Sequence, residues 1–189
     1  MGANSSLIFG IIMNVAILLV FFRFLMQLAE VGAYNPVVMA TVKATRIVDV
    51  FSRILPTLAK GRVNLAALTL VVVLYLMKIF GVMYLSHMMP NSAVHLLILT
   101  FVTMIQDLIT FCRYLIFATI ILSWVVMFTQ SRSPYIEVIQ ELAEPLLAPF
   151  RRLLPNMGMI DLSPILAILT LFVIQRIMDA VAITLLTGL

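Results

Sequence analysis

The sequence predicts an all-α membrane protein with four transmembrane helices arranged as two tandem units. Of its 189 residues, 63% are hydrophobic and 11% are charged, four apolar runs are long, and similar landmarks recur about 99 residues apart. A soluble domain is about 45–50% apolar and about 25% charged, so this chain lacks the charge to cover a water-facing surface. Disorder is excluded too, because it requires low hydrophobicity.

Candidate spans are defined by length. A helix needs about 20 apolar residues to cross about 30 Å of hydrocarbon. The apolar runs cover residues 7–28, 63–85, 94–128 and 164–186. The third run is too long for one simple span, and we divide it at Gln106-Asp107. This division predicts a span over 107–128 and an extra, interfacial or partly embedded helix over 94–105. The alternative is a fifth, thin span.

Orientation is predicted from the basic residues. Eight of the 12 Lys and Arg residues lie in two connections, at Lys43, Arg46, Arg53, Lys60, Arg62, Arg132, Arg151 and Arg152. Because Lys and Arg mark the cytoplasmic loops of membrane proteins, segments 29–62 and 129–163 are predicted to be cytoplasmic and both termini to lie outside. The net charge of +4 then reflects topology, and no direct binding of nucleic acid is expected.

An internal repeat organises the single membrane domain, 1–189. Residues 51–56 recur as 150–155, and Asn35-Pro36 recurs as Ser133-Pro134. We therefore predict a first unit at 7–89 and a second at 107–187. Two spans per unit keep both copies in the same orientation, so the repeat should be parallel. The predicted structural turns are at Pro36, Pro56, Pro134, Pro145, Pro149 and Pro155.

The second connection contains an amphipathic segment. Apolar residues recur at helical spacing over 136–150, with Glu137, Glu141 and Glu144 on the opposite face. Such a helix either lies in the inner interface or packs on the spans, and Pro145 and Pro149 should break or kink it. The first copy lacks these prolines and should run straighter. The candidate contacts with lipid phosphates or partners are Arg53, Arg132, Arg151 and Arg152.

Catalytic and metal-binding patterns are missing from the sequence. Cys112 is the single cysteine, and His87 and His95 are the two histidines, with no third ligand of a usual zinc set nearby. No nucleophile–base set or phosphate-binding loop is recognisable. We therefore expect no enzyme activity, no cofactor and no metal. The expected partners are membrane lipids, other membrane proteins or a second copy of the chain.

Charged residues within the apolar runs are the candidate functional residues. Arg23 lies near the inner end of its span, from which its side chain can snorkel. The other five are Lys78, Asp107, Arg113, Arg176 and Asp179. Unpaired, each would cost about 2.5–3.5 kcal/mol on insertion scales. Either each aspartate pairs with a cation across a helix interface, or the surplus of cations forms a hydrated, positively charged cavity that binds an anion or headgroup.

The landmarks resemble the YggT family (also called YlmG) of small membrane proteins from bacteria and plastids. The matching residues are Arg23, 34–36, 53–56, 122–124, 132–134, 142–147, 149–155, 158–161, Ser163 and Pro164. This resemblance implies a multi-pass protein of the bacterial inner membrane. It also implies links to hyperosmotic tolerance, ion homeostasis and cell division, and in plastids to nucleoid organisation and cytochrome assembly. We expect a lipid- or protein-binding scaffold or assembly factor, with an oligomeric ion transporter or modulator of ion uptake as the alternative.

Overall fold

The computed structural model describes residues 2–53, 55, 57–58, 63–87, 92–130, 133–154 and 161–187. Its helices are α1 (Gly2–Leu28), α2 (Pro36–Ala44), α3 (Ile47–Phe51), α4 (Leu65–Leu85), α5 (Ala93–Thr129), α6 (Pro134–Leu153) and α7 (Ser163–Thr187). A short antiparallel ribbon pairs β1 (Thr57–Leu58) with β2 (Val63–Asn64). Three predicted site residues, Pro56, Arg132 and Pro155, lie outside the described residues.

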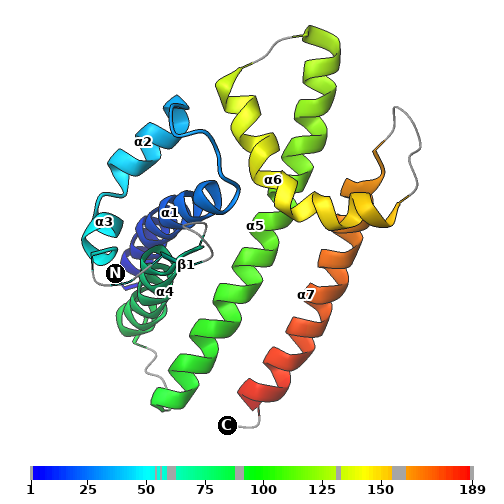
Figure 1. Ribbon diagram of the computed structural model, residues 1–189. Helices are drawn as coiled ribbons and strands as arrows, with labels where there is room; N and C mark the ends of the chain where they lie inside the picture. The colour runs from blue at the N-terminus through cyan, green and yellow to red at the C-terminus, as the bar shows by residue number, and fades with distance from the viewer. Residues whose placement is uncertain are drawn as a thin grey trace.

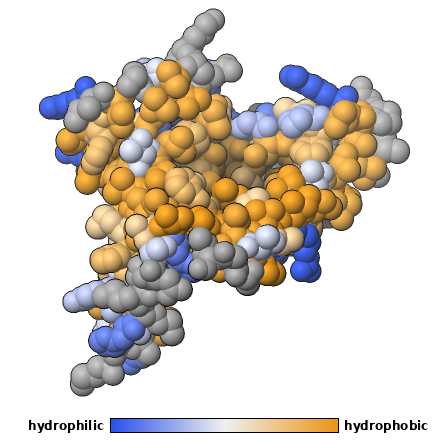
Figure 2. Space-filling view, turned by 90° about the horizontal axis from the view of Figure 1, so that it is seen from below, coloured by the Kyte–Doolittle hydropathy of each residue, from blue (hydrophilic) through white to orange (hydrophobic). Residues whose placement is uncertain are grey.

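Among the described residues, four helices are long and apolar enough to cross a membrane, namely α1, α4, α5 and α7, and their number matches the four spans predicted. Their side chains largely face outward, since the buried share of the most apolar stretch is 28% in α1 and only 11% in α7. Most of the surface visible in Figure 2 is hydrophobic, and hydrophilic residues gather at its periphery. The chain is therefore a multi-pass membrane protein.

The separate helix predicted over 94–105 is wrong. α5 runs without interruption over 37 residues, a length of about 55 Å at the usual rise. The polar pair that suggested a boundary is accommodated inside the helix, because its two side chains bind different neighbours. Gln106 donates to Asp179 of α7, and Asp107 pairs with Lys78 of α4. α5 ends at Thr129, and its C-cap residue, Gln130, has a φ of 51°, which lies in the left-handed region.

The long helices pack as two pairs. α1 lies along α4 and α5 lies along α7, while contacts between α4 and α5 join the pairs (Figure 1). α6 crosses α5 and α7 and also touches α2. The best-buried core gathers where these connecting helices meet the long ones, with members such as Val48, Val71, Ile116, Leu142 and Ala167. Two helices and a short ribbon connect α1 to α4, whereas α6 connects α5 to α7, and the internal repeat stays a prediction.

The second connection is one bent helix. α6 continues through Pro145 and Pro149, and Figure 1 shows it bending where it crosses the long helices. Its apolar face is buried, with Val138, Leu142 and Leu147 each about 1% exposed. Of the two arrangements left open by the sequence, α6 adopts the one in which the helix packs on the spans.

The first connection is broken, so the expectation of a straighter helix there is wrong. α2 ends at Ala44, and a turn at Thr45 and Arg46 precedes α3. Arg23 contacts both sides of this break, because its guanidinium donates to the carbonyl of Thr45 at 2.9 Å and pairs with Asp49. The same carbonyl also accepts from the backbone N–H of Val48 at 3.0 Å. Arg23, expected to snorkel, is instead 12% exposed and holds the connection.

Candidate functional site

The five charged residues predicted at membrane depth form two groups on different sides of α5. Lys78 of α4 and Asp107 lie at the α4–α5 interface. Arg113, Arg176 and Asp179 line a hollow between α5 and α7. The sequence identified these residues, but one-dimensional spacing does not show which neighbouring helix each faces.

The α4–α5 group consists of one ion pair and one further hydrogen bond to the same carboxylate. Nζ of Lys78 lies 3.1 Å from Oδ2 of Asp107, and the hydroxyl of Tyr75 donates to the same oxygen at 3.1 Å. The ammonium also lies 5.1 Å from the centre of the Tyr75 ring, within range of a cation–π interaction. Opposite charges balance in this group, and its contacts join α4 to α5.

The α5–α7 group surrounds a polar hollow of about 230 Å³, lined by Arg113, Phe172, Gln175, Arg176 and Asp179. We call this space the polar hollow. Arg113 reaches it from α5, and its guanidinium lies 4.5 Å from the centre of the Phe172 ring. The other four residues come from successive turns of α7. Because Arg176 and Asp179 are three residues apart, they share one face of this helix.

The polar hollow carries an excess of positive charge. Oδ1 of Asp179 accepts a hydrogen bond from Nε2 of Gln106 at 2.9 Å. In the described part of the chain, no carboxylate lies within ion-pairing distance of Arg113 or Arg176. Two guanidinium groups thus face one carboxylate. Oε1 of Gln175 is buried and has no hydrogen-bond partner, so an acceptor is also unused at this site.

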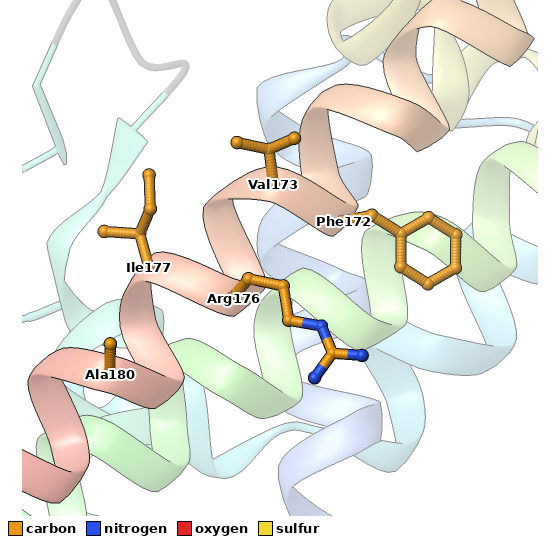
Figure 3. Close-up of a pocket in the computed structure, with 5 residues that line it drawn as sticks. All are labelled: Phe172, Val173, Arg176, Ile177 and Ala180. Carbon is orange, nitrogen blue, oxygen red and sulfur yellow. The ribbon is translucent and has the colours of Figure 1, made fainter.

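An apolar groove adjoins the polar hollow. It has a volume of about 410 Å³ and is lined by Phe172, Val173, Arg176, Ile177 and Ala180, and we call it the α7 groove. Figure 3 shows Phe172 and Arg176 extending to the same side of α7, whereas Val173 and Ile177 point elsewhere. Because both spaces share Phe172 and Arg176, a charged site lies directly beside an apolar one.

The predicted interfacial cations have different surroundings. Arg151 pairs with Glu144, and its Nε donates to Asp161 at 3.0 Å, which ties the end of α6 to the start of α7. Burial alone would lower the pKa of Arg151, but the hydrogen bonds to the two carboxylates outweigh it and raise this pKa. Arg53 and Arg152 are exposed, and neither forms an ion pair with another described residue. They remain available for contacts outside the protein.

The two connections meet at a capping residue. Oδ1 of Asn35 accepts from the backbone N–H of Val37 at 2.9 Å, and its Nδ2 donates to the carbonyl of Pro134 at 3.1 Å. Asn35 thus caps α2 and fastens it to the first residue of α6. Pro36 and Pro134 start their helices, where a missing N–H costs nothing.

The part of the chain that matches known proteins includes the whole polar hollow. The profile of the CCB3/YggT family matches residues 98–182, which include every residue lining the polar hollow. Protein YggT of Escherichia coli K12 is 36% identical over 172 residues, covering 88% of this chain and 87% of that protein. Protein PA0392 of Pseudomonas aeruginosa is 31% identical over 180 residues, covering 93% and 89%.

The chain belongs to the YggT family. An uncharacterised protein of Haemophilus influenzae is also 31% identical, over 177 residues that cover 93% of this chain and 92% of that protein. No solved structure matches the chain. The sequence resemblance is therefore confirmed, and the geometry above describes a YggT-family membrane protein.

Sequence reasoning missed the uncharged polar residues of this YggT-family protein. Tyr75, Gln106 and Gln175 each lie within four residues of a predicted charge and on a helix that carries it. A search of the spans for polar residues of every kind, rather than for ionisable ones, would have found them. Over the described residues, no group of three His, Cys, Asp or Glu side chains is arranged to hold a metal ion.

Proposed function

We propose that this YggT-family protein is a non-enzymatic scaffold of the bacterial inner membrane that binds anionic lipids and partner membrane proteins. Its connections would face the cytoplasm and its termini the outside, and its role would lie in envelope maintenance, osmotic adaptation or division. The observation that carries the proposal is the pair of exposed cations, Arg53 and Arg152, that follow α3 and end α6 without an ion-pair partner among the described residues.

The surroundings of Arg152 support contact with lipid. Leu153, its neighbour in the chain, is 74% exposed, so an apolar side chain and a cation lie together at the end of α6. At a membrane surface the cation attracts anionic headgroups, and this attraction contributes about 1 kcal/mol of binding free energy per Lys or Arg. The apolar side chain favours burial at the acyl boundary. Because α6 is packed on the spans, these contacts are held in a fixed position.

The test is the lipid content of protein extracted together with its native membrane. We expect anionic phospholipids to be enriched around the wild-type protein relative to bulk membrane. The double variant Arg53→Gln/Arg152→Gln should lose a substantial part of this enrichment. The matched control is Arg53→Lys/Arg152→Lys, which keeps both positive charges at the same exposed positions and should retain most of it. Equal losses in both variants, or no enrichment at all, would contradict the proposal.

A second candidate function is ion transport or its modulation, which the Lys78–Asp107 ion pair inside two candidate spans favours. Ionisable residues within spans often mark ion or proton pathways. Reconstitution of the purified protein into vesicles separates the candidates. Ion flux that Asp107→Asn abolishes would favour transport, whereas a membrane protein that co-purifies stoichiometrically and an absence of flux would favour the scaffold.

A further inference from the structure

The polar hollow contains more positive charge than its own residues neutralise. Arg113 and Arg176 share it with Asp179, whose Oδ1 is already engaged by Gln106. The three charged groups leave a surplus of one positive charge. An arginine left without a partner near the middle of a span is costly, by about 2.5–3.5 kcal/mol on insertion scales. A bound anion would remove this cost.

The position of the polar hollow indicates where the anion comes from. Arg176 lies near the middle of α7, which spans Ser163–Thr187, and it is exposed. α7 is also the least covered of the four candidate spans, with 11% of its most apolar stretch buried. A ligand in the surrounding lipid can therefore approach the hollow along the uncovered surface of α7, and Figure 3 shows Arg176 and Phe172 extending to the same side of this helix.

The adjoining α7 groove shows what else the ligand contains. Val173, Ile177 and Ala180 line it together with the aliphatic part of Arg176, so its lining is almost entirely apolar. A ligand that fills both spaces has a charged end and an apolar end.

We propose that the polar hollow and the α7 groove together bind one phospholipid whose headgroup carries a single negative charge. Its phosphate oxygens contact Arg113 and Arg176, because a guanidinium matches two oxygens of a phosphate. An acyl chain lies along the α7 groove, next to Phe172 and Arg176, which line both spaces. This inference rests on the proposed lipid-binding function and assigns a ligand to a second site.

The test uses the full-length protein in nanodiscs that contain equal amounts of phosphatidylglycerol and phosphatidylcholine. After mild detergent release, native mass spectrometry counts the lipids that remain bound. The wild-type protein should retain one phosphatidylglycerol in preference to phosphatidylcholine. Arg113→Gln/Arg176→Gln should reduce this retention by about tenfold or more, as expected for the loss of charge-assisted hydrogen bonds. The control Arg53→Gln/Arg152→Gln leaves the hollow intact and should keep the tightly bound lipid.

Two further variants keep both arginines, so they remain informative if the arginine double variant does not fold. Asp179→Asn preserves an acceptor for Gln106 but raises the surplus charge, so retention of phosphatidylglycerol should increase. Ala180→Phe fills the α7 groove without changing charge, so retention should fall. If inorganic phosphate raises the unfolding temperature of delipidated wild type and Ala180→Phe equally, and no lipid is retained, the occupant is free phosphate and the phospholipid assignment is overturned.

The outcomes also separate this inference from the proposed function. Retention that depends on Arg53 and Arg152 but not on Arg113 and Arg176 would overturn the inference and leave the proposed function standing. A wild-type protein that binds phosphatidylglycerol no better than phosphatidylcholine would overturn both.

Discussion

Asp107 is the acceptor for two groups of α4, because the ammonium of Lys78 and the hydroxyl of Tyr75 both lie 3.1 Å from its Oδ2. The two charges are unequally covered, since Lys78 is 14% exposed and Asp107 is 47% exposed. Loss of the aspartate therefore leaves a largely buried ammonium without its counter-charge. Loss of the lysine leaves a carboxylate that solvent or lipid headgroups still reach.

We expect Asp107→Asn to lower the free energy of unfolding by about 1–3 kcal/mol, less than for a fully buried pair because Asp107 is half exposed. Lys78→Met should lower the free energy of unfolding by less than Asp107→Asn does. The double variant should lower it by less than the sum of the two single losses. A double-mutant cycle, measured by unfolding in detergent, checks this. Strict additivity would show that the pair does not join α4 to α5.

Asp161 gives a pH-dependent contact at the start of α7. Burial alone would raise the pKa of Asp161, but hydrogen bonds from Ser163 and the guanidinium of Arg151 outweigh it and hold this pKa below the ordinary 3.8. A carboxyl whose pKa is lower in the folded state stabilises the fold above its unfolded pKa, and this stabilisation is lost as the pH falls below it.

The difference in stability between wild type and Asp161→Asn should therefore be constant from pH 7 to about 5 and shrink below about pH 4. Because Asp161 is 43% exposed, the difference at neutral pH should be about 0.5–1 kcal/mol. Thermal unfolding in detergent across this range measures it. A difference that is independent of pH would contradict the role given to the ionised carboxylate.

At the scale of elements, Arg23 links the two helices of the first connection. It bridges the end of α2 and α3 through the carbonyl of Thr45 and the carboxylate of Asp49. Arg23→Met should lower the free energy of unfolding by about 1–2 kcal/mol, because a charge-assisted hydrogen bond is lost and Asp49 is half exposed. Unfolding in detergent and protease sensitivity of the α2–α3 turn check this expectation. A variant that is more stable than wild type would indicate a snorkelling arginine.

The helices show which features a sequence can predict. α1, α4 and α7 were predictable because an uninterrupted apolar run of sufficient length has few alternatives in lipid. The continuity of α5 was not, because Gln106 and Asp107 resemble a boundary until their partners on α7 and α4 are known. The turn after α2 also contacts Arg23, which lies 22 residues before Thr45. Local sequence patterns do not contain these tertiary contacts.

At the scale of the whole molecule, the charged site illustrates the same limit. All the ionisable residues of the polar hollow were predicted from their unusual positions in apolar runs. Their division into a neutral pair and a cationic hollow was not, since it depends on α5 packing against α4 on one side and α7 on another. The adjoining apolar groove has no signature in the sequence, because apolar residues are common along the whole of α7.

The orientation of the molecule is the remaining whole-molecule prediction. α2 contacts α6, so both connections gather at one end, and their excess of Lys and Arg should keep that end in the cytoplasm.

We expect a cysteine at Tyr34, which is 96% exposed, to resist a membrane-impermeant maleimide in spheroplasts and to react after permeabilisation. A cysteine at Val94, 55% exposed near the start of α5, should react in both conditions. Cys112→Ser supplies the background for both variants, since Cys112 is the single native cysteine. The reverse pattern would place the connections outside, and it would move Arg53 and Arg152 away from the anionic lipids of the cytoplasmic leaflet that the proposed function assigns to them.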